Sequence, residues 1–450
     1  MAAIDQTPAP VAATAATVVA TPTATPAARR RAAVLATLGN VLEWYDFTVY
    51  GFLAAYIAAT FFPSEDHIAS LLAAFAVFAV GFIARPLGAL ILGPLVDRKG
   101  RKSVMLVSMM LMALGSLLVG IAPGYIVAGA TGAMLVVLGR LLQGFSAGGE
   151  FGSSAVYLVE WADERKRGLY GSFHQIATYG GLIFGVFFVA ILSSILGPAN
   201  MAAWGWRIPF LFGAALAIVV LVLRRRITDS PVFEEATSAA ATAERQAEKT
   251  DSRLPGLVTG FFLTIGVVAL WGVTSMVTIN YMPTYVSNFA GIEPRSALWA
   301  VAIGGVLTVA LIPVFGSLSD RLGRKVFVIG AAIAYIVLPW PLLAWLVASQ
   351  SFWTVVVTQL IFAVPTAAMA GVGSSTIAEL FPTDRRGTLV SIGTAIAVTV
   401  FGGFGAYICT WLIQVTHITV APAFYIAAVA LLTLITGILL PNLAHRSLRA

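Results

Sequence analysis

The 450-residue chain has few charged side chains and a single cysteine. Asp, Glu, Lys and Arg make up 10% of the residues, hydrophobic residues make up 59%, and the mean hydropathy is +0.91. A water-soluble globule of this composition would aggregate, so the sequence favours a protein that lives in a bilayer. Cys409, the single thiol, excludes an internal disulfide and a cysteine metal cluster.

Metal and nucleotide motifs are also missing. The sequence has no paired-histidine site and no Walker loop. We therefore expect a protein that is not an enzyme and that holds no metal or other cofactor.

Long apolar runs recur along the whole chain. A helix that crosses the ~30 Å hydrocarbon layer needs about 20 mostly apolar residues. We predict an all-α integral membrane protein with twelve transmembrane helices, over residues 33–61, 68–95, 103–122, 130–160, 168–196, 207–224, 256–285, 297–318, 326–347, 352–381, 387–415 and 421–440.

Basic residues fall mainly on one side of these predicted spans. Of the 27 Lys and Arg residues, only Arg207 and Arg295 lie on the opposite side, and Arg85 and Arg140 lie within spans. Because Lys and Arg near helix ends stay in the cytoplasm, both termini are expected to be cytoplasmic, in a bacterial-type inner membrane. The net charge of +7 follows from this bias and predicts no nucleic-acid partner.

An internal repeat divides the chain. "GPLVDRKGRK" (Gly93–Lys102) recurs as "GSLSDRLGRK" (Gly316–Lys325), each after the second helix of a group of six, and "VEWADERKRG" and "AELFPTDRRG" end the fourth and tenth spans. The halves are therefore parallel repeats, with a solute site between them. We predict a disordered tail at 1–32, six-helix bundles at 33–224 and 256–441, a cytoplasmic linker at 225–255 and a tail at 442–450.

The two repeated loops resemble the signature loop of the major facilitator superfamily. Four further segments, "GNVLEWYDF", "GFIARPLGA", "GRLLQGFSAGGE" and "WGWRIPF", together resemble the metabolite:proton symporter family, whose members carry citrate, tricarballylate, 2-oxoglutarate, shikimate or betaines. The resemblance covers about residues 33–441. It implies alternating access with the proton gradient as the energy source, and we expect a monomer.

The resemblance also implies a latch at the cytoplasmic ends of the helices. In the family, the loop aspartate pairs with the arginine four residues on and with a neighbouring helix N-terminus, where the helix dipole favours an anion. The alternative is a solvated turn that merely follows the positive-inside bias. The gating candidates are Gly93, Asp97, Arg101, Gly316, Asp320, Arg324, Glu160 and Glu379.

Buried charges cluster in the first half. Helical spacing puts Asn40, Glu43, Asp46 and Tyr50 on one stripe of the first span. An ionised group at the bilayer centre costs at least ~2.5 to 3.5 kcal/mol, so these acids should pair with basic partners or line a wet cavity. The basic partners are Arg85 and Arg140, and Arg140 shares one face of the fourth span with Gln143 and Glu150. The alternative is a buried network that only fixes helix packing.

The resemblance assigns roles to these charges. A first-helix carboxylate and a fourth-helix arginine act as a proton couple in several members of the superfamily, and Asp46 with Arg140 match that couple, with Glu43 as the competing carrier. The candidates for solute binding are Arg140, Arg85, Gln143, Tyr50, His174, Gln175, Tyr281, Tyr285 and Asn280.

Two membrane arginines favour an anionic solute, because guanidinium pairs bidentately with carboxylate. We expect proton-driven import of a small organic acid, a di- or tricarboxylate such as citrate or 2-oxoglutarate. A betaine or shikimate symporter is the alternative within the class, and a channel or a transporter-like nutrient sensor is the alternative outside it.

Overall fold

The computed structural model describes residues 26–99, 101–148, 159, 162, 165–225 and 256–442. Side chains are described for all of these except 26–37, 93–103, 105, 224–225 and 383–385. The predicted linker, apart from residue 225, and the two predicted tails, apart from residues 26–32 and 442, lie outside the described residues. Residues 26–32 begin a helix and do not belong to a disordered tail. Within the described ranges, every regular element is a helix.

The first half of the chain forms the helices that correspond to the first six predicted spans. They are α1 (Pro26–Phe52), α2 (Ala54–Phe61), α3 (His67–Lys99), α4 (Arg101–Ile121), the short α5 (Tyr125–Ala128), α6 (Ala130–Ala147), α8 (Arg167–Ala203), the 3-10 turn η1 (Gly205–Arg207) and α9 (Ile208–Arg225).

The second half forms the helices that correspond to the other six spans. They are α11 (Leu257–Ser275), the π-helix η2 (Met276–Tyr281), α12 (Met282–Phe289), α13 (Pro294–Leu322), α14 (Arg324–Val337), α15 (Pro339–Ser349), α16 (Phe352–Glu379), α17 (Thr383–Ala397), the π-helix η3 (Val398–Gly403), α18 (Gly405–Thr416) and α19 (Pro422–Leu439).

The twelve-helix prediction is confirmed as a fold, with breaks inside several spans. In the described ranges, 9 helices are long and apolar enough to cross a membrane, and α14 with α15, bent by 42°, makes a tenth. The bend lies at Pro339, which has no N–H to continue the helix ladder. The first predicted span is divided into α1 and α2 at Leu53, whose φ and ψ are −101° and 9°.

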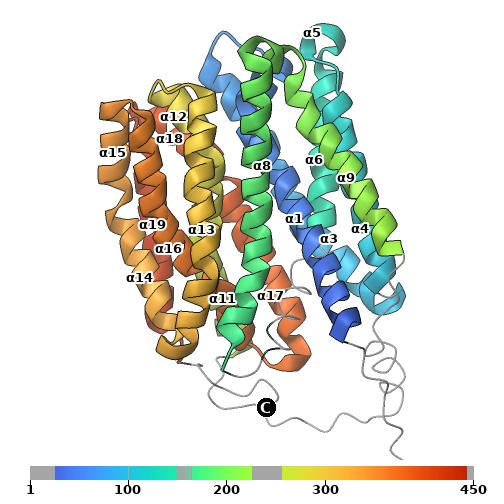
Figure 1. Ribbon diagram of the computed structural model, residues 1–450, viewed down its shortest axis with the longest axis vertical. Coiled ribbons are helices and arrows are strands. Elements are labelled where there is room, and N and C mark those ends of the chain that lie inside the picture. The colour runs from blue at the N-terminus through green and yellow to red at the C-terminus, as the bar shows by residue number, and fades with distance from the viewer. Residues whose placement is uncertain are drawn as a thin grey trace, which may run out of the picture.

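The helices stand side by side as two groups (Figure 1). The first half, from blue to green, lies on the right, and the second half, from yellow to red, lies on the left, with α8 and α13 at the junction. The end that carries α5 and α12 is called the outer end below, and the end that carries the start of α14 and α17 is called the inner end, which the basic residues predict to be cytoplasmic.

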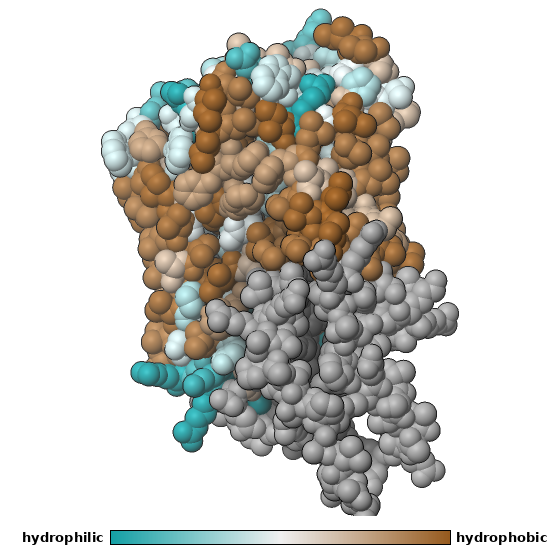
Figure 2. Space-filling model, turned by 45° about the vertical axis from the view of Figure 1, so that its right-hand side comes forward, coloured by the Kyte–Doolittle hydropathy of each residue, from teal (hydrophilic) through white to brown (hydrophobic). Residues whose placement is uncertain are grey.

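The flank of the molecule is apolar (Figure 2). Brown residues cover most of the visible side, whereas teal residues gather at the outer end and at the lower left. Large hydrophobic side chains are exposed on helices of both halves, including Leu90, Met134, Phe262 and Val326. Lipid tails would cover these side chains, which matches the multi-pass membrane protein indicated by the composition.

Candidate functional site

Asp46 lies at the centre of a fully buried hydrogen-bond network. The side chain is 1% exposed and points from α1 toward α4 and α6. Its Oδ2 accepts from Ser116 Oγ and, at 3.0 Å, from Gln143 Nε2. Gln143 Nε2 also donates to Ser116 Oγ at 2.9 Å. Two neutral side chains therefore hold this buried carboxylate.

Arg140 joins the network through Gln143. Arg140 Nη1 donates to Gln143 Oε1 at 2.8 Å, and Gln143 Nε2 in turn donates to Asp46 Oδ2. Among the ion pairs of the described residues, none joins Asp46 directly to Arg140. Asp46 and Arg140, which match the proton couple of the family, are therefore linked in this conformation through the Gln143 amide, which bonds one atom of each group.

One edge of the Arg140 guanidinium has no hydrogen-bond acceptor among the described residues. Nε and Nη2 have no hydrogen-bond partner in the described part of the chain, although the side chain is 0% exposed. The rings of Phe47, Tyr50 and Phe78 lie 4.5, 4.7 and 5.2 Å from the guanidinium carbon. The Nε–Nη2 edge can bind a carboxylate through two parallel hydrogen bonds. Gly81 faces it, since a Cβ there would lie 3.3 Å from both nitrogens.

The second buried arginine already has an acid. Arg85 Nη2 lies 3.3 Å from Glu43 Oε1, and both side chains are buried. The guanidinium carbon of Arg85 also lies 4.1 Å from the Phe47 ring centroid and 4.6 Å from that of Phe82. Phe47 thus contacts both guanidinium groups. Glu150, the remaining acid expected in this cluster, lies outside the described residues.

The two halves touch between the buried site and the outer end. Asn280 Nδ2, on η2, donates to the Thr48 carbonyl at 2.9 Å, and Gly51 provides the room, because a Cβ there would lie 1.8 Å from Asn280 Oδ1. Nearer the surface, His67 Nε2 lies 2.8 Å from Asn288 Oδ1.

The halves also touch at the inner end. Asp320, on α13, accepts from the backbone N–H groups of Gly168 and Leu169 at 2.7 and 3.1 Å, at the N-terminus of α8. Arg324 Nη1 lies 2.9 Å from Asp320, and Arg324 Nη2 lies 3.1 Å from Glu379. These are the contacts that the family resemblance implied for this aspartate. In this conformation the two halves are therefore in contact at both ends of their interface.

The equivalent inner contacts of the first half cannot be described. The side chains of Asp97 and Arg101 and the position of Glu160 lie outside the described residues, and Gly93 is described only as part of helix α3. Gly316 lies against α8, since a Cβ there would be 2.7 Å from the Gly168 carbonyl.

The remaining predicted solute-binding residues are buried but scattered. Gln175 Nε2 donates to Ser374 Oγ at 2.9 Å across the interface and lies 3.3 Å from His174 Nδ1. Each of the three tyrosine hydroxyls has a protein partner: Tyr50 donates to the Ala74 carbonyl, Tyr281 accepts from Thr410, and Tyr285 donates to the Thr419 carbonyl.

The segment Gly144–Gly148 spells Gly-x-Ser-x-Gly, the letters of a hydrolase nucleophile elbow. Here the letters fall at the end of helix α6 and not on a turn that follows a strand. The Ser146 hydroxyl is buried and donates to the Ser108 carbonyl at 2.7 Å. Ser146 therefore lacks the exposed position that a nucleophile needs.

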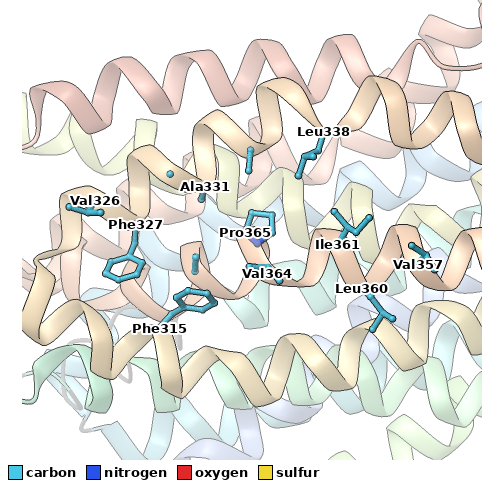
Figure 3. Close-up of a pocket in the computed structure, with 13 residues that line it drawn as sticks. Phe315, Val326, Phe327, Ala331, Leu338, Val357, Leu360, Ile361, Val364 and Pro365 are labelled. Atoms are coloured by element: carbon cyan, nitrogen blue, oxygen red, sulfur yellow. The ribbon is translucent and has the colours of Figure 1, made fainter.

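An apolar groove lies away from the interface (Figure 3). It encloses about 600 Å³ between α13, α14 and α16, and its lining residues, such as Phe315, Phe327 and Leu360, are apolar. Val326 and Val364 at its rim are 59% and 45% exposed on the flank. The groove faces the lipid and offers a polar solute no hydrogen-bonding side chain.

Comparisons with known proteins agree with this architecture. A family model described as sugar (and other) transporter matches residues 32–450. The proline/betaine transporter of Escherichia coli K12 is 33% identical over 428 residues, 93% of this chain and 85% of the relative. The citrate-proton symporter of Salmonella typhi is 34% identical over 400 residues, 89% of this chain and 91% of the relative.

The fold has a solved counterpart. The structure of the proton:xylose symporter XylE bound to 6-bromo-6-deoxy-D-glucose matches with a TM-score of 0.75 and 20% identity, over 94% of this chain and 98% of that one. The chain therefore belongs to the sugar (and other) transporter family, within the major facilitator superfamily of membrane transporters.

Proposed function

We propose that this protein is a proton symporter that imports a small carboxylate-bearing solute across the cytoplasmic membrane by alternating access. The observation that carries the proposal is the Nε–Nη2 edge of Arg140, buried and without a hydrogen-bond partner in the described part of the chain. A buried guanidinium edge is costly to leave unpaired, and a solute carboxylate would satisfy it.

Asp46 is the proposed proton carrier, and Gln143 connects it to Arg140. A solute carboxylate at Arg140 neutralises the positive charge that helps to keep Asp46 ionised. Proton uptake by Asp46 then accompanies solute binding, and each event favours the other. Glu43 is the second candidate, although its ion pair with Arg85 already stabilises its ionised form.

An organic acid such as citrate or 2-oxoglutarate is the first candidate solute. Support comes from the citrate-proton symporters of Salmonella typhi and Klebsiella pneumoniae, which are 34% and 32% identical to this chain. A di- or tricarboxylate could use the Arg140 edge for one carboxylate and the amides and hydroxyls of the interface for the others.

A betaine or proline is the second candidate, and a specific observation favours it. Glu43 neutralises Arg85, so that one buried arginine, Arg140, is left for solute carboxylates. One guanidinium matches one carboxylate, and a zwitterion adds no net charge to the occluded cavity. The proline/betaine transporter at 33% identity also supports this class.

One uptake panel separates these solutes. The purified protein is placed in liposomes with an alkaline interior, and uptake of citrate, 2-oxoglutarate, shikimate, glycine betaine and proline is compared with that of xylose, which has no carboxylate. We expect at least one carboxylate to accumulate above its outside concentration and xylose not to accumulate. Xylose accumulation without carboxylate uptake, or uptake indifferent to the proton gradient, contradicts the proposal.

The inner contacts around Asp320 are proposed to act as a latch that holds the inner end closed. Asp320→Asn keeps the size of the side chain but removes the charge that faces Arg324 and the α8 N-terminus. Breaking one partner of a buried pair costs several kcal/mol, so the inner end should open at least about tenfold more often and turnover should fall.

Access to the inner end can be measured with a thiol label. The label is placed at Ser375→Cys, which lies next to Gly171, and Cys409→Ser removes the native thiol. The rate of reaction of the new thiol with a membrane-impermeant maleimide then measures how often the inner end opens. Glu293→Gln removes an exposed carboxylate at the other end of α13 and is the matched control. Equal labelling in the Asp320→Asn and control proteins would count against the latch.

A further inference from the structure

We propose that Ser116 is a positioning residue for proton coupling, whose hydroxyl changes its acceptor between Asp46 and the Met112 carbonyl as Asp46 loses or gains a proton. The inference rests on the proton-coupled function proposed above. It adds an uncharged residue from the third predicted span. Ser116 neither binds the solute nor takes up the coupled proton, and it acts only through its hydrogen bond to Asp46.

The observed contacts describe the ionised state of Asp46. Ser116 Oγ is within hydrogen-bond reach of Asp46 Oδ2 and also lies 3.0 Å from the Met112 carbonyl oxygen. A hydroxyl has one hydrogen and can donate to one of these acceptors at a time. A carboxylate is the stronger acceptor, so the hydrogen points to Asp46 while that group is charged.

Protonation of Asp46 reverses the direction of this bond. The new O–H group on Oδ2 donates to Ser116 Oγ, and Ser116 turns its own hydrogen to the Met112 carbonyl. Gln143 Nε2, at 3.0 Å from Asp46 and 2.9 Å from Ser116, donates to both oxygens in either state. Ser116 keeps its hydrogen and the added proton stays on Asp46. The same three side chains therefore satisfy both forms of the acid.

The other carboxylate oxygen lacks such an arrangement. Asp46 Oδ1 has no hydrogen-bond partner in the described part of the chain and faces α9, where a Cβ on Gly213 would lie 2.5 Å from it. A proton on Oδ1 would create a buried donor with no acceptor, which is unfavourable. The geometry thus assigns the proton to Oδ2, the oxygen beside Ser116.

The charges around Asp46 do not change when Ser116 is replaced. The charged and titratable groups near Asp46 are Arg140 on α6, Arg85 on α3, and Glu43, Tyr45 and Tyr50 on α1, whereas α4 and α9 present Ser116 and Gly213. An altered pH dependence after removal of the hydroxyl therefore reports the lost hydrogen bond.

Ser116→Ala is expected to move the pH of half-maximal solute exchange upward by about one unit, a tenfold change in the balance between the two forms. The ionised carboxylate loses a charge-assisted donor, whereas the neutral acid loses a weaker bond, so the proton-loaded form that exchanges solute persists to higher pH. Exchange is measured in proteoliposomes at equal pH on both sides, with radiolabelled citrate or glycine betaine, whichever the wild-type protein exchanges faster.

Two variants test the hydroxyl itself. Ser116→Thr keeps the hydroxyl and should restore the wild-type midpoint. Ser108→Ala, two turns earlier on α4, removes a buried hydroxyl that has no hydrogen-bond partner in the described part of the chain, and should leave the midpoint unchanged. Ser116→Cys, with a weak donor of similar size, replaces the alanine variant if that variant does not fold.

The outcomes separate this inference from the function on which it rests. A wild-type protein without proton-driven uptake of any carboxylate of the uptake panel overturns the proposed function and, with it, the role of Ser116. A wild-type protein that couples to protons, with an Ala variant whose midpoint stays within about 0.3 units of wild type, overturns the role of Ser116 alone. A shift in Ala that Thr does not reverse also overturns it.

Discussion

Asp46→Asn is expected to abolish proton-driven accumulation while solute exchange continues. An asparagine imitates the protonated, neutral aspartate permanently, and its amide can still contact Ser116 and Gln143. A symporter that moves one proton per solute concentrates the solute about tenfold for each pH unit of gradient. The Asn variant should bring the inside concentration only up to the outside concentration, because no proton site remains to couple the gradient.

The measurement uses liposomes with an alkaline interior, and a pH-sensitive dye records proton entry on addition of solute. Glu43→Gln is the matched control, since it removes the other buried carboxylate of α1, the one that pairs with Arg85 at 3.3 Å. Accumulation above the outside concentration in Asp46→Asn, together with its loss in Glu43→Gln, would move the proton site to Glu43.

The bilayer explains why the sequence predicts so much of this fold. A span must be about 20 residues long and apolar, so that length and composition place a helix in each of the twelve predicted spans. The ends are less accurate: α1 begins at Pro26 where residue 33 is predicted, and α8 ends at Ala203 where residue 196 is predicted. The breaks are harder to predict. The π-helices η2 and η3 lie in the spans that carry Asn280 and Thr399, and these two side chains bond the Thr48 and Phe82 carbonyls of the other half. Such distortions depend on contacts between distant segments.

The site shows the same limit at the level of side chains. Helical spacing brings Asp46 and Gln143 to facing helices, but the position of the Gln143 amide between Asp46 and Arg140 depends on side-chain rotamers that a sequence does not specify. The pattern of buried charges does not identify Ser116, because its side chain is uncharged. A hydroxyl in an apolar helix is a weak signal, since it can bond its own backbone four residues earlier, as Ser116 also does with Met112.

Arg140→Lys is expected to weaken solute binding by roughly 10- to 100-fold even though the positive charge is retained. A lysine ammonium cannot present the parallel N–H groups of the Nε–Nη2 edge, so at least one charge-assisted hydrogen bond of about 1.5–3 kcal/mol to the solute carboxylate is lost. The bond from Nη1 to Gln143, 2.8 Å long in the native protein, would also be disturbed. Affinity is measured by isothermal titration or by competition with a radiolabelled solute.

Arg85→Lys is the matched control for the loss of affinity in Arg140→Lys. Arg85 is buried, stacks on Phe47 as Arg140 does, and is neutralised by Glu43. A lysine can keep an ion pair with Glu43, so we expect less than about threefold loss of affinity at this position. Equal losses in the two variants would indicate that both arginines hold the packing of α1 and that neither binds the solute. A large loss at Arg140 alone identifies its Nε–Nη2 edge as the carboxylate site. The two arginines share burial, charge and a contact with Phe47, and they differ in that Arg85 already forms an ion pair with Glu43.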